Sequence, residues 1–344
     1  MLSDELVPPY SRVPLSKGVL AGTEDAAAAT LAELPASVEL RLGAKAVALH
    51  TEQRAVELDN GTSVEFDGLV IATGARARRL AAPGQTGELV VRTIADAELI
   101  SQRIIGAHSA IVVGGGFLGM EVASTLIKHG LSVTVVDRDP PLRRVLGEWL
   151  AEVLVARAED QGLKFVLAPD GVELVGNPVS AVAVGPGTKI EADVIISAVG
   201  DLPNVEWLES SGLPITGGLI IDGACKVARG IVAAGDVAVR QISTGEFRRT
   251  PHWTSAVIQA QAAARSLLDP TTEPYRADHY FWTEQFDTDL KISGELPLQG
   301  SPRVLEGDVD DRSALLQWTV GDRPVASAAL NFRMSVARLK QLAH

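Results

Sequence analysis

Cysteine is almost absent from this sequence, because Cys225 is the only one among 344 residues. A single cysteine excludes an intrachain disulfide framework and a CxxC redox pair. Cys225 stands outside every motif described below, so we expect it to be a small, buried, apolar residue.

Long apolar runs are also missing. No segment reaches the roughly 20 apolar residues that a membrane-spanning helix needs. The N-terminus has no basic-then-apolar secretory signal. We therefore expect no membrane association and a cytoplasmic location.

Basic residues are fewer than acidic ones: the chain has 31 Lys and Arg and 43 Asp and Glu, for a net charge of −12. Nucleic-acid binding depends on a basic face, so this balance argues against a nucleic-acid partner. Simple solubility explains the acidity. Apolar residues make up 46 % and charged residues 22 % of the chain, as in soluble globular proteins. At this length we expect two or three domains.

Hydrophobic periodicity and glycine turns predict the order of elements. An alanine-rich helix is predicted at 23–33, and an Asn60–Gly61 turn predicts a hairpin within 38–66. Buried strands are predicted at 69–74, 193–200 and 230–238, and helices at 147–161 and from about 253 to 268, before Pro270. The section from Pro274 alternates strands and ends in a helix, so we interpret it as an appended α+β domain.

The most informative motif is SAIVVGGGFLGMEVASTLIKHGLSVTVVD at 109–137. Its order of strand, glycine turn, helix and strand predicts a βαβ unit, with GxGxxG at Gly114, Gly116 and Gly119. The first glycine permits the tight turn. The second lets the backbone approach a pyrophosphate, which lies over amide donors at the helix N-terminus. This context favours nicotinamide dinucleotide binding over a purely structural glycine turn.

Asp137 stands 18 residues past Gly119, at the end of the second strand. A carboxylate there accepts hydrogen bonds from ribose hydroxyls and repels a 2′-phosphate, so NADH is favoured over NADPH. Arg138, Arg143 and Arg144 either rescue NADPH binding or form a solvated helix start, and we favour the second interpretation.

Two further strand-to-glycine junctions are ATG at 72–74 and AAGD at 233–236. Both follow predicted strands at the carboxyl end, where ligands gather in open α/β sheets. Asp236 either accepts hydrogen bonds from a polyol chain or caps a turn. Trp282, in YFWTEQFD, is either a core residue or a cofactor contact, and its spacing does not separate the two.

In this order the motifs YSRVPLSK, ATG, GGGFLGMEVA, AGD and FWTEQFD resemble those of the two-dinucleotide flavoproteins. The likeness is specifically to the FAD-dependent NADH:ferredoxin reductases of bacterial Rieske dioxygenases and cytochromes P450, and it runs through essentially the whole chain. It implies an α/β fold with two Rossmann-like, three-layer dinucleotide domains and a C-terminal α+β domain. The implied boundaries are 1–104 and 225–273 for two parts of a truncated FAD-type domain, 105–224 for the NAD-binding domain, and 274–344 for the last domain.

The resemblance also implies roles for individual residues. Lys17 beside the flavin ring and Glu121 beside the nicotinamide form the implied catalytic pair. The implied FAD contacts are Arg12 and Arg78 near the pyrophosphate, Thr73 and Gly74 near the adenosine half, Gly235 and Asp236 at the ribityl chain, and Trp282 beside the isoalloxazine. The implied NADH contacts are Gly114, Gly116, Phe117, Leu118, Gly119, Asp137 and Gly200. No metal site is expected.

Members of this family have a strand, a GxGxxG, a helix and a second strand before the YxRPPLSK-like stretch, whereas only MLSDELVPP precedes Tyr10 here. The first strand of a Rossmann sheet is central, so we expect the strands at 69–74 and 230–238 to be left without a shared neighbour. About 35 upstream residues, a companion polypeptide or a second copy of the chain would supply the missing strand. Alternatively, the domain has closed around the gap.

Smaller departures from the family pattern lie elsewhere. Asp201 and Leu202 stand where the family has apolar residues near the nicotinamide pocket. Pro251 and His252 stand where the family has an acid before the tryptophan of a late helix.

Two functions are compatible with these motifs. The first is an NADH:ferredoxin oxidoreductase that passes electrons through FAD to the iron–sulfur ferredoxin of an oxygenase. The alternative is a flavin-poor paralogue that acts as a binding or scaffold subunit. The retained flavin motifs favour the enzyme. Five arginines form either a basic surface that steers an acidic ferredoxin or ordinary surface charges: Arg76, Arg78, Arg79, Arg248 and Arg249.

Overall fold

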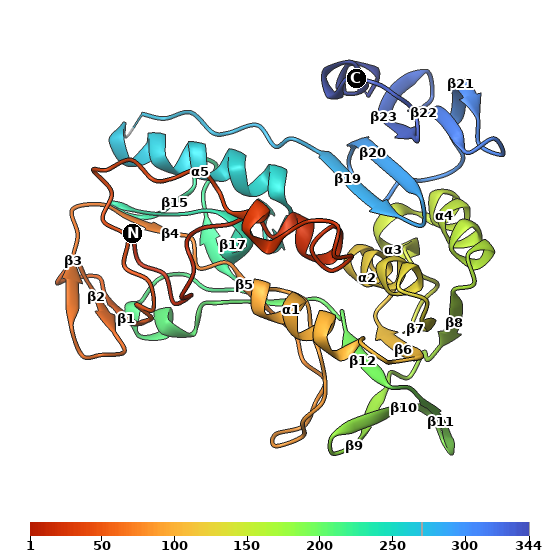
Figure 1. The fold of residues 1–344 in the computed structure, drawn as a ribbon. Helices are drawn as coiled ribbons and strands as arrows, with labels where there is room; N and C mark the ends of the chain where they lie inside the picture. The colour runs from red at the N-terminus through yellow and green to blue at the C-terminus, as the bar shows by residue number, and fades with distance from the viewer. Residues whose placement is uncertain (270, 344) are drawn as a thin grey trace. The chain divides into compact units, whose positions relative to one another are not determined.

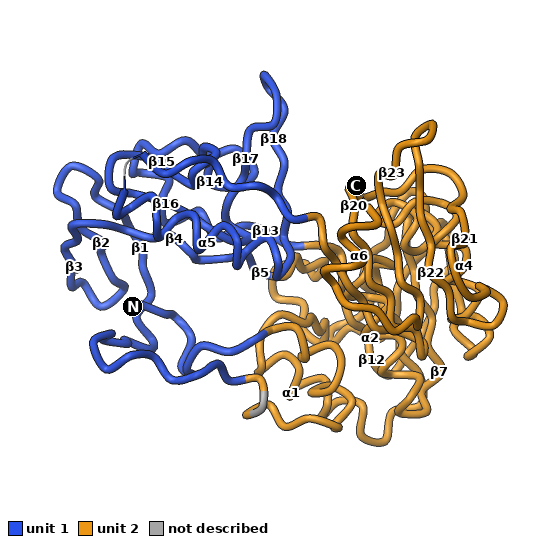
Figure 2. Tube along the Cα trace, turned by 90° about the horizontal axis from the view of Figure 1, so that it is seen from above, with its two compact units in different colours: residues 1–11, 30–76, 201–278 blue, residues 12–29, 77–200, 279–344 orange. Residues whose placement is uncertain are grey.

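The computed structural model describes residues 1–269 and 271–343. Contacts divide the chain into two compact units, coloured separately in Figure 2. Unit 1 consists of residues 1–11, 30–76 and 201–278, and unit 2 consists of residues 12–29, 77–200 and 279–344. The four-part domain division expected from the sequence stays a prediction.

Unit 2 contains a parallel sheet in the strand order β12-β6-β7-β8 (Figure 1). Its strands are β6 (Ser109–Val113), β7 (Ser132–Asp137), β8 (Lys164–Leu167) and β12 (Val194–Ser197). Helix α2 (Phe117–Lys128) joins β6 to β7, which confirms the predicted βαβ unit. The apolar residues of β6 and β12 are buried, as expected for strands covered on both faces.

Further helices belong to the same unit. Helix α1 (Ile94–Arg103) begins at a capping box between Thr93 and Asp96. Helices α3 (Arg143–Leu146) and α4 (Glu148–Asp160) follow β7, which confirms the helix predicted at 147–161. A small antiparallel sheet is formed by β9 (Glu173–Gly176), β10 (Val179–Gly185) and β11 (Thr188–Glu191).

The C-terminal section of unit 2 is a five-stranded antiparallel sheet in the order β19-β20-β23-β22-β21. The strands are β19 (Tyr280–Gln285), β20 (Thr288–Gly294), β21 (Arg303–Asp308), β22 (Ser313–Val320) and β23 (Arg323–Leu330). Helix α6 (Val336–Leu342) packs on this sheet through Leu339. The alternating strands and final helix predicted from the sequence are confirmed.

The helix predicted at 23–33 is wrong. Among the described residues from 12 to 33, the helical elements are the short 3-10 turns η1 (Val13–Ser16) and η2 (Ala26–Ala29). Directly after η2, Thr30 bridges to Tyr10 and the Leu31 amide donates to the Pro9 carbonyl at 3.0 Å. Pairing with a distant segment therefore replaces the helical hydrogen bonds that alanine favours.

Unit 1 contains several small sheets. The predicted hairpin region forms β1 (Ala46–His50), β2 (Ala55–Leu58) and β3 (Ser63–Glu65), with Gly61 at a φ of 79° in the expected turn. A second sheet consists of β14 (Leu219–Ile221), β17 (Ala238–Ser243) and β18 (Glu246–Arg248). Strand β5 (Ala75–Ala77) pairs with β13 (Asp201–Pro203), and two 3-10 turns are η3 (Glu206–Ser211) and η4 (Gly235–Val237).

A third sheet of unit 1 has the order β15-β16-β4, from β15 (Lys226–Ala228), β16 (Ile231–Ala233) and β4 (Leu69–Ile71). Strands β4 and β16 pair directly and in parallel. As expected, no shared neighbour lies between them among the described residues, and the two strands pair with each other instead. Among the described residues β4 ends this sheet, and Val70 is 45 % exposed whereas Ile71 is 1 % exposed. The strand predicted as fully buried is an edge strand.

Helix α5 (Trp253–Leu268) matches the helix predicted from about 253 to 268. The stop signal expected at Pro270 lies outside the described residues. The helix buries Ser255, Gln259, Ala262, Ala263 and Ser266, which recur at helical spacing along one face. Cys225 belongs to the same core cluster as Ala262 and Ala263, and burial raises the pKa of its thiol to about 12. The expectation of a buried cysteine is confirmed. No helix in the described ranges combines the length and apolarity needed to cross a bilayer.

Candidate functional site

The glycine turn after β6 combines two close backbone approaches with one open position. Gly114 has a φ of 109°, and an added Cβ would run into the carbonyl oxygen of Ala198. At Gly119 an added Cβ would meet the Gly114 carbonyl oxygen. Gly116 differs, since nothing lies within 4 Å of an added Cβ at the N-cap of α2. Two glycines therefore permit close packing, and the third leaves open space over the helix N-terminus.

Asp137 ties this turn to the end of β7. Its Oδ2 accepts from the Gly115 amide and its Oδ1 from the Arg138 amide, both at 2.6 Å. Each carboxylate oxygen has a further lone pair, so Asp137 retains acceptor capacity for a ribose. Two of the three neighbouring arginines lie near acids: Arg143 pairs with Glu148, and Arg144 Nη1 is 4.0 Å from Asp139 Oδ2. The Arg138 guanidinium lies beside Gly171.

The structure brings the predicted catalytic pair into contact in unit 2. Glu121, on α2, is only 6 % exposed. Its Oε2 accepts from Lys17 Nζ at 2.8 Å and from Ser16 Oγ at 2.7 Å, and its Oε1 accepts from Thr283 Oγ1 at 2.8 Å. These donors come from η1, the residue after it, and β19. Both oxygens of this buried carboxylate are therefore engaged, and the bond from Lys17 is a charge-assisted hydrogen bond.

Sequence reasoning missed Ser16 and Thr283. Ser16 directly precedes Lys17 in the PLSK stretch, and Thr283 directly follows Trp282 in FWTEQFD. Both are therefore inside motifs that the sequence analysis identified. Their contact with Glu121 depends on bringing together segments more than 100 residues apart, as the separations of 105 and 162 residues show.

Aromatic side chains from the two predicted cofactor motifs lie close to each other. The Phe117 ring is 4.1 Å from the Phe281 ring, centroid to centroid, with a 32° angle between their planes. Trp282 is partly exposed, and its ring centroid is 5.8 Å from that of Tyr280. Trp282 is thus not a fully buried core residue. Leu118, at the start of α2, is exposed.

Three other predicted residues of unit 2 make backbone contacts. The Arg78 amide donates to the Gly200 carbonyl at 3.0 Å, which joins an implied FAD residue to an implied nicotinamide residue. Gly200 has a φ of 94°. Arg12 Nη1 donates to the Arg92 carbonyl at 2.7 Å.

The remaining four predicted residues, Thr73, Gly74, Gly235 and Asp236, belong to unit 1. Asn204 both accepts hydrogen bonds from the ATG turn and donates hydrogen bonds to it. Thr73 Oγ1 donates to the Asn204 carbonyl at 2.9 Å, and the Asn204 amide groups donate to the carbonyls of Thr73 and Gly74. The Thr73 hydroxyl oxygen keeps acceptor capacity.

A buried side chain, Gln259, and a partly exposed one, Arg249, contact the AGD turn. Gly235, with a φ of 80°, donates its amide to Gln259 Oε1 at 2.8 Å. The Asp236 carbonyl accepts from Arg249 Nε at 3.0 Å. Arg249 Nη1 also lies 2.7 Å from Asp201 Oδ1, so the Asp201 departure from the family pattern has a charged partner. Arg249 Nη2 is buried and has no hydrogen-bond partner among the described residues. A polar ligand beside this turn would satisfy such a donor.

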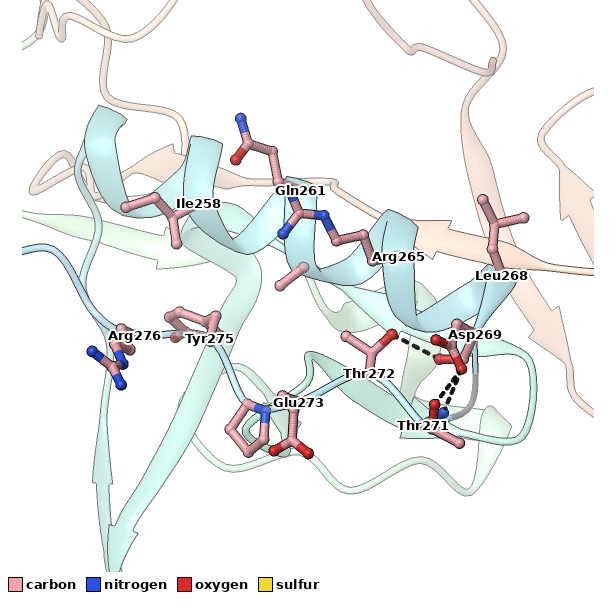
Figure 3. A pocket seen from close by; sticks show the side chains of 12 residues that line it. Ile258, Gln261, Arg265, Leu268, Asp269, Thr271, Thr272, Glu273, Tyr275 and Arg276 are labelled. Carbon is pink, nitrogen blue, oxygen red and sulfur yellow. Dashed lines mark hydrogen bonds between the residues drawn. The ribbon is translucent and has the colours of Figure 1, made fainter.

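A separate cavity of about 690 Å³ lies beside α5 and the segment after it (Figure 3). Its wall includes Arg265, Asp269, Glu273 and Arg276. Two arginines and two acids give this wall no charge preference for one class of ligand. None of the predicted cofactor residues is among those described as lining it.

The chain is similar to known flavoprotein reductases. The family model for pyridine nucleotide-disulphide oxidoreductases matches residues 1–262. The ferredoxin–NAD(+) reductase component of the anthranilate 1,2-dioxygenase system from Burkholderia cepacia is 32 % identical, over 99 % of this chain and 86 % of that protein.

Two solved structures extend the similarity to the fold. The ferredoxin reductase for the CYP199A2 system from Rhodopseudomonas palustris aligns with a TM-score of 0.86 and 30 % identity, over 96 % of this chain and 84 % of that chain. Putidaredoxin reductase, in its covalent complex with putidaredoxin, aligns with a TM-score of 0.85 and 27 % identity, over 99 % and 85 % of the two chains. The chain therefore belongs to the pyridine nucleotide-disulphide oxidoreductase family, among its ferredoxin–NAD(+) reductases.

Proposed function

We propose that this chain is an FAD-dependent NADH:ferredoxin oxidoreductase that passes electrons to the iron–sulfur carrier of an oxygenase. The observation that carries the proposal is the ion pair between Lys17 and the buried Glu121 of α2, the helix whose N-terminus follows the glycine turn. Family membership implies FAD and NADH as cofactors. The names of the relatives support a ferredoxin acceptor, since one serves a dioxygenase system and another was solved bound to putidaredoxin.

NADH is proposed to bind over Gly116, with its ribose at Asp137. Preference for NADH over NADPH is supported by the Asp137 charge and by the acids beside Arg143 and Arg144, which reduce the positive charge available to a 2′-phosphate. We expect the dissociation constant for NADPH to exceed that for NADH by at least about tenfold, and Asp137→Ser to narrow this ratio. Equal affinities in the unaltered chain would contradict the preference.

The proposed FAD contacts of unit 1 are the Thr73–Gly74 and Gly235–Asp236 turns. Those of unit 2 are Arg12, Arg78 and Trp282. The unsatisfied Arg249 Nη2 beside the Asp236 turn fits a polar ligand. When bound, the flavin accepts two electrons from a nicotinamide and releases them singly. The Lys17 side chain is 17 % exposed, so its ammonium group can face a ligand while it stays paired with Glu121. Such a preorganised cation stabilises negative charge that develops within its reach.

The basic surface for ferredoxin has less support than the reaction itself. Three of the five arginines considered have carboxylate partners, since Arg76 pairs with Glu206, Arg79 lies 3.8 Å from Glu88, and Arg249 pairs with Asp201. The Arg76 hydrogen bond lowers the pKa of Glu206. These three arginines are therefore engaged in ion pairs and do not form a free basic surface, so we expect ferredoxin reduction to depend only weakly on salt.

Further expectations from the sequence remain proposals: the domain boundaries at 104, 224 and 273, the companion strand, and the cytoplasmic location. The free side of β4 supports a companion strand from another polypeptide, a second copy or upstream residues. No relative and no described residue favours the alternative of a flavin-poor scaffold subunit.

The test of the proposal is spectroscopic. The purified chain is titrated with FAD, then with NADH without oxygen, and finally mixed with an oxidised iron–sulfur ferredoxin. We expect a yellow protein that NADH bleaches and that ferredoxin reoxidises. Lys17→Met is expected to bind FAD but to bleach about 100-fold more slowly. A chain that stays colourless in excess FAD would refute the proposal.

A further inference from the structure

A line of buried hydrogen bonds extends behind Glu121 into the C-terminal sheet. Thr283 is fully buried and Gln285 is 4 % exposed. They are alternate residues of β19 and therefore share one face of the strand. Gln285 Nε2 donates to Thr283 Oγ1 at 3.1 Å, and Thr283 Oγ1 donates to Glu121 Oε1 at 2.8 Å.

The contact with Glu121 sets the direction of these hydrogen bonds. A hydroxyl has one proton to donate, and the Thr283 hydroxyl donates it to Glu121 Oε1. The Thr283 oxygen then needs a donor, which orients the Gln285 amide with its nitrogen toward Thr283. The Gln285 carbonyl oxygen is left buried with no hydrogen-bond partner in the described structure. Leaving a buried oxygen without a donor costs free energy, so we expect the hydrogen bond from Gln285 Nε2 to Thr283 to offset that cost.

We propose that Thr283, supported by Gln285, is a positioning residue for the Lys17–Glu121 pair. By holding Oε1, Thr283 turns Oε2 toward Ser16 and Lys17 and thereby sets the position of the Lys17 ammonium. This inference rests on the proposed function, in which Lys17 faces the flavin. Shifts of about 1 Å in such groups reduce rates about 100-fold.

The backbone around the cluster has separate anchors. Thr125 Oγ1, on α2, donates to the Ser16 carbonyl at 3.0 Å. Ser124 Oγ, on the same helix, accepts from the Phe286 amide at 2.8 Å. Both segments that face α2 are therefore held without the Thr283 hydroxyl. Replacing Thr283 by the isosteric valine should leave the fold intact while it frees Glu121 Oε1 and the Gln285 Nε2 that donated to the hydroxyl.

Three variants and two measurements test the inference. Thr283→Val removes the hydroxyl, and Thr283→Ser restores it. Thr288→Val is the matched control, because Thr288 is equally buried on the adjacent strand β20 but bonds to Arg157 and Phe286 instead. The first measurement is the acetylation rate of Lys17 by acetic anhydride in the flavin-free chain, followed by peptide mass spectrometry. The second is the bleaching rate of the FAD-loaded chain by NADH.

We expect Thr283→Val to raise Lys17 acetylation severalfold, because the ammonium is less firmly held. Bleaching at saturating NADH should slow about tenfold, as expected for losing one hydrogen bond to a charged group. The NADH concentration at half-maximal rate should not change. Thr283→Ser should restore both rates, and Thr288→Val should alter neither.

Gln285→Met gives a second test that does not depend on Thr283→Val folding. It removes the unsatisfied buried oxygen, so the melting temperature should not fall, yet Lys17 acetylation should still rise. A purely structural role predicts that stability and acetylation change together.

The outcomes separate this inference from the proposed function. If Thr283→Val and Thr288→Val behave alike in both measurements, the positioning role is refuted. If NADH does not bleach the unaltered chain, the proposed function fails. In that case the acetylation rates alone decide, since a rise confined to Thr283→Val and Gln285→Met supports the positioning of Lys17 and its absence refutes it.

Discussion

Replacing Gly116 by alanine should separate folding from cofactor binding. Gly116 has a φ of −76°, which any residue adopts, and an added Cβ has nothing within 4 Å. Alanine is a poorer N-cap than glycine by less than about 1 kcal/mol, so the free energy of unfolding should change by no more than that. The added methyl group, however, occupies the space over α2 where a pyrophosphate would lie.

The expected loss in binding follows from the blocked amides. One hydrogen bond to a charged group contributes about 1.5–3 kcal/mol, which corresponds to a rise of about 10- to 100-fold in the NADH dissociation constant. Urea unfolding and an NADH fluorescence titration measure the two effects. Gly68→Ala is the control, since an added Cβ there makes ordinary contact with Leu267 at 3.4 Å. If Gly116→Ala binds NADH within twofold of the unaltered chain, NADH does not lie over this turn.

Three further predictions concern stability and reactivity. Gly147→Ala should lower the free energy of unfolding in urea by more than about 3 kcal/mol, because the added Cβ would overlap the backbone carbonyl of Leu298. Gly162→Ala should lower it by only about 1–2 kcal/mol, because Gly162 has a similar φ of 90° but open space around it. Equal costs would contradict the overlap. Cys225, with its pKa raised to about 12 by burial, should react with a thiol reagent at pH 8 only after unfolding, and fast labelling of the native chain would contradict its burial. A double-mutant cycle on Asp201→Asn and Arg249→Gln should give a coupling energy of about 1–2 kcal/mol. This value lies between those of exposed and fully buried ion pairs, because the two side chains are 23 % and 18 % exposed. A coupling energy of zero would show that the pair does not contribute to stability.

Local sequence was sufficient to predict the elements in which residue spacing, turn residues and burial all indicate the same structure. The βαβ unit at 109–137 was predictable because continuous apolar strands, three spaced glycines and a helical repeat all indicate the same structure. The Asn60–Gly61 turn was predictable because a backbone with positive φ selects these residue types. The structure of the alanine-rich stretch at 23–33 was not predictable in this way, because helix propensity contributes only tenths of a kcal/mol per residue. Pairing of Thr30 and Leu31 with residues 9 and 10 takes the place of a helix there.

By itself, then, the sequence determined the hairpin turn, the apolar strands and the glycine turn, since all of these depend on spacing within about 30 residues. The flavin contacts were implied by the family resemblance. Only the tertiary structure showed that β4 pairs directly with β16, that Ser16 and Thr283 meet the Glu121 carboxylate, and that Asp201 faces Arg249. These contacts join segments that are distant in the chain. Burial selects the partners in these contacts, because a buried charge needs a hydrogen-bond donor or an opposite charge. Local periodicity does not indicate which distant residue supplies that partner.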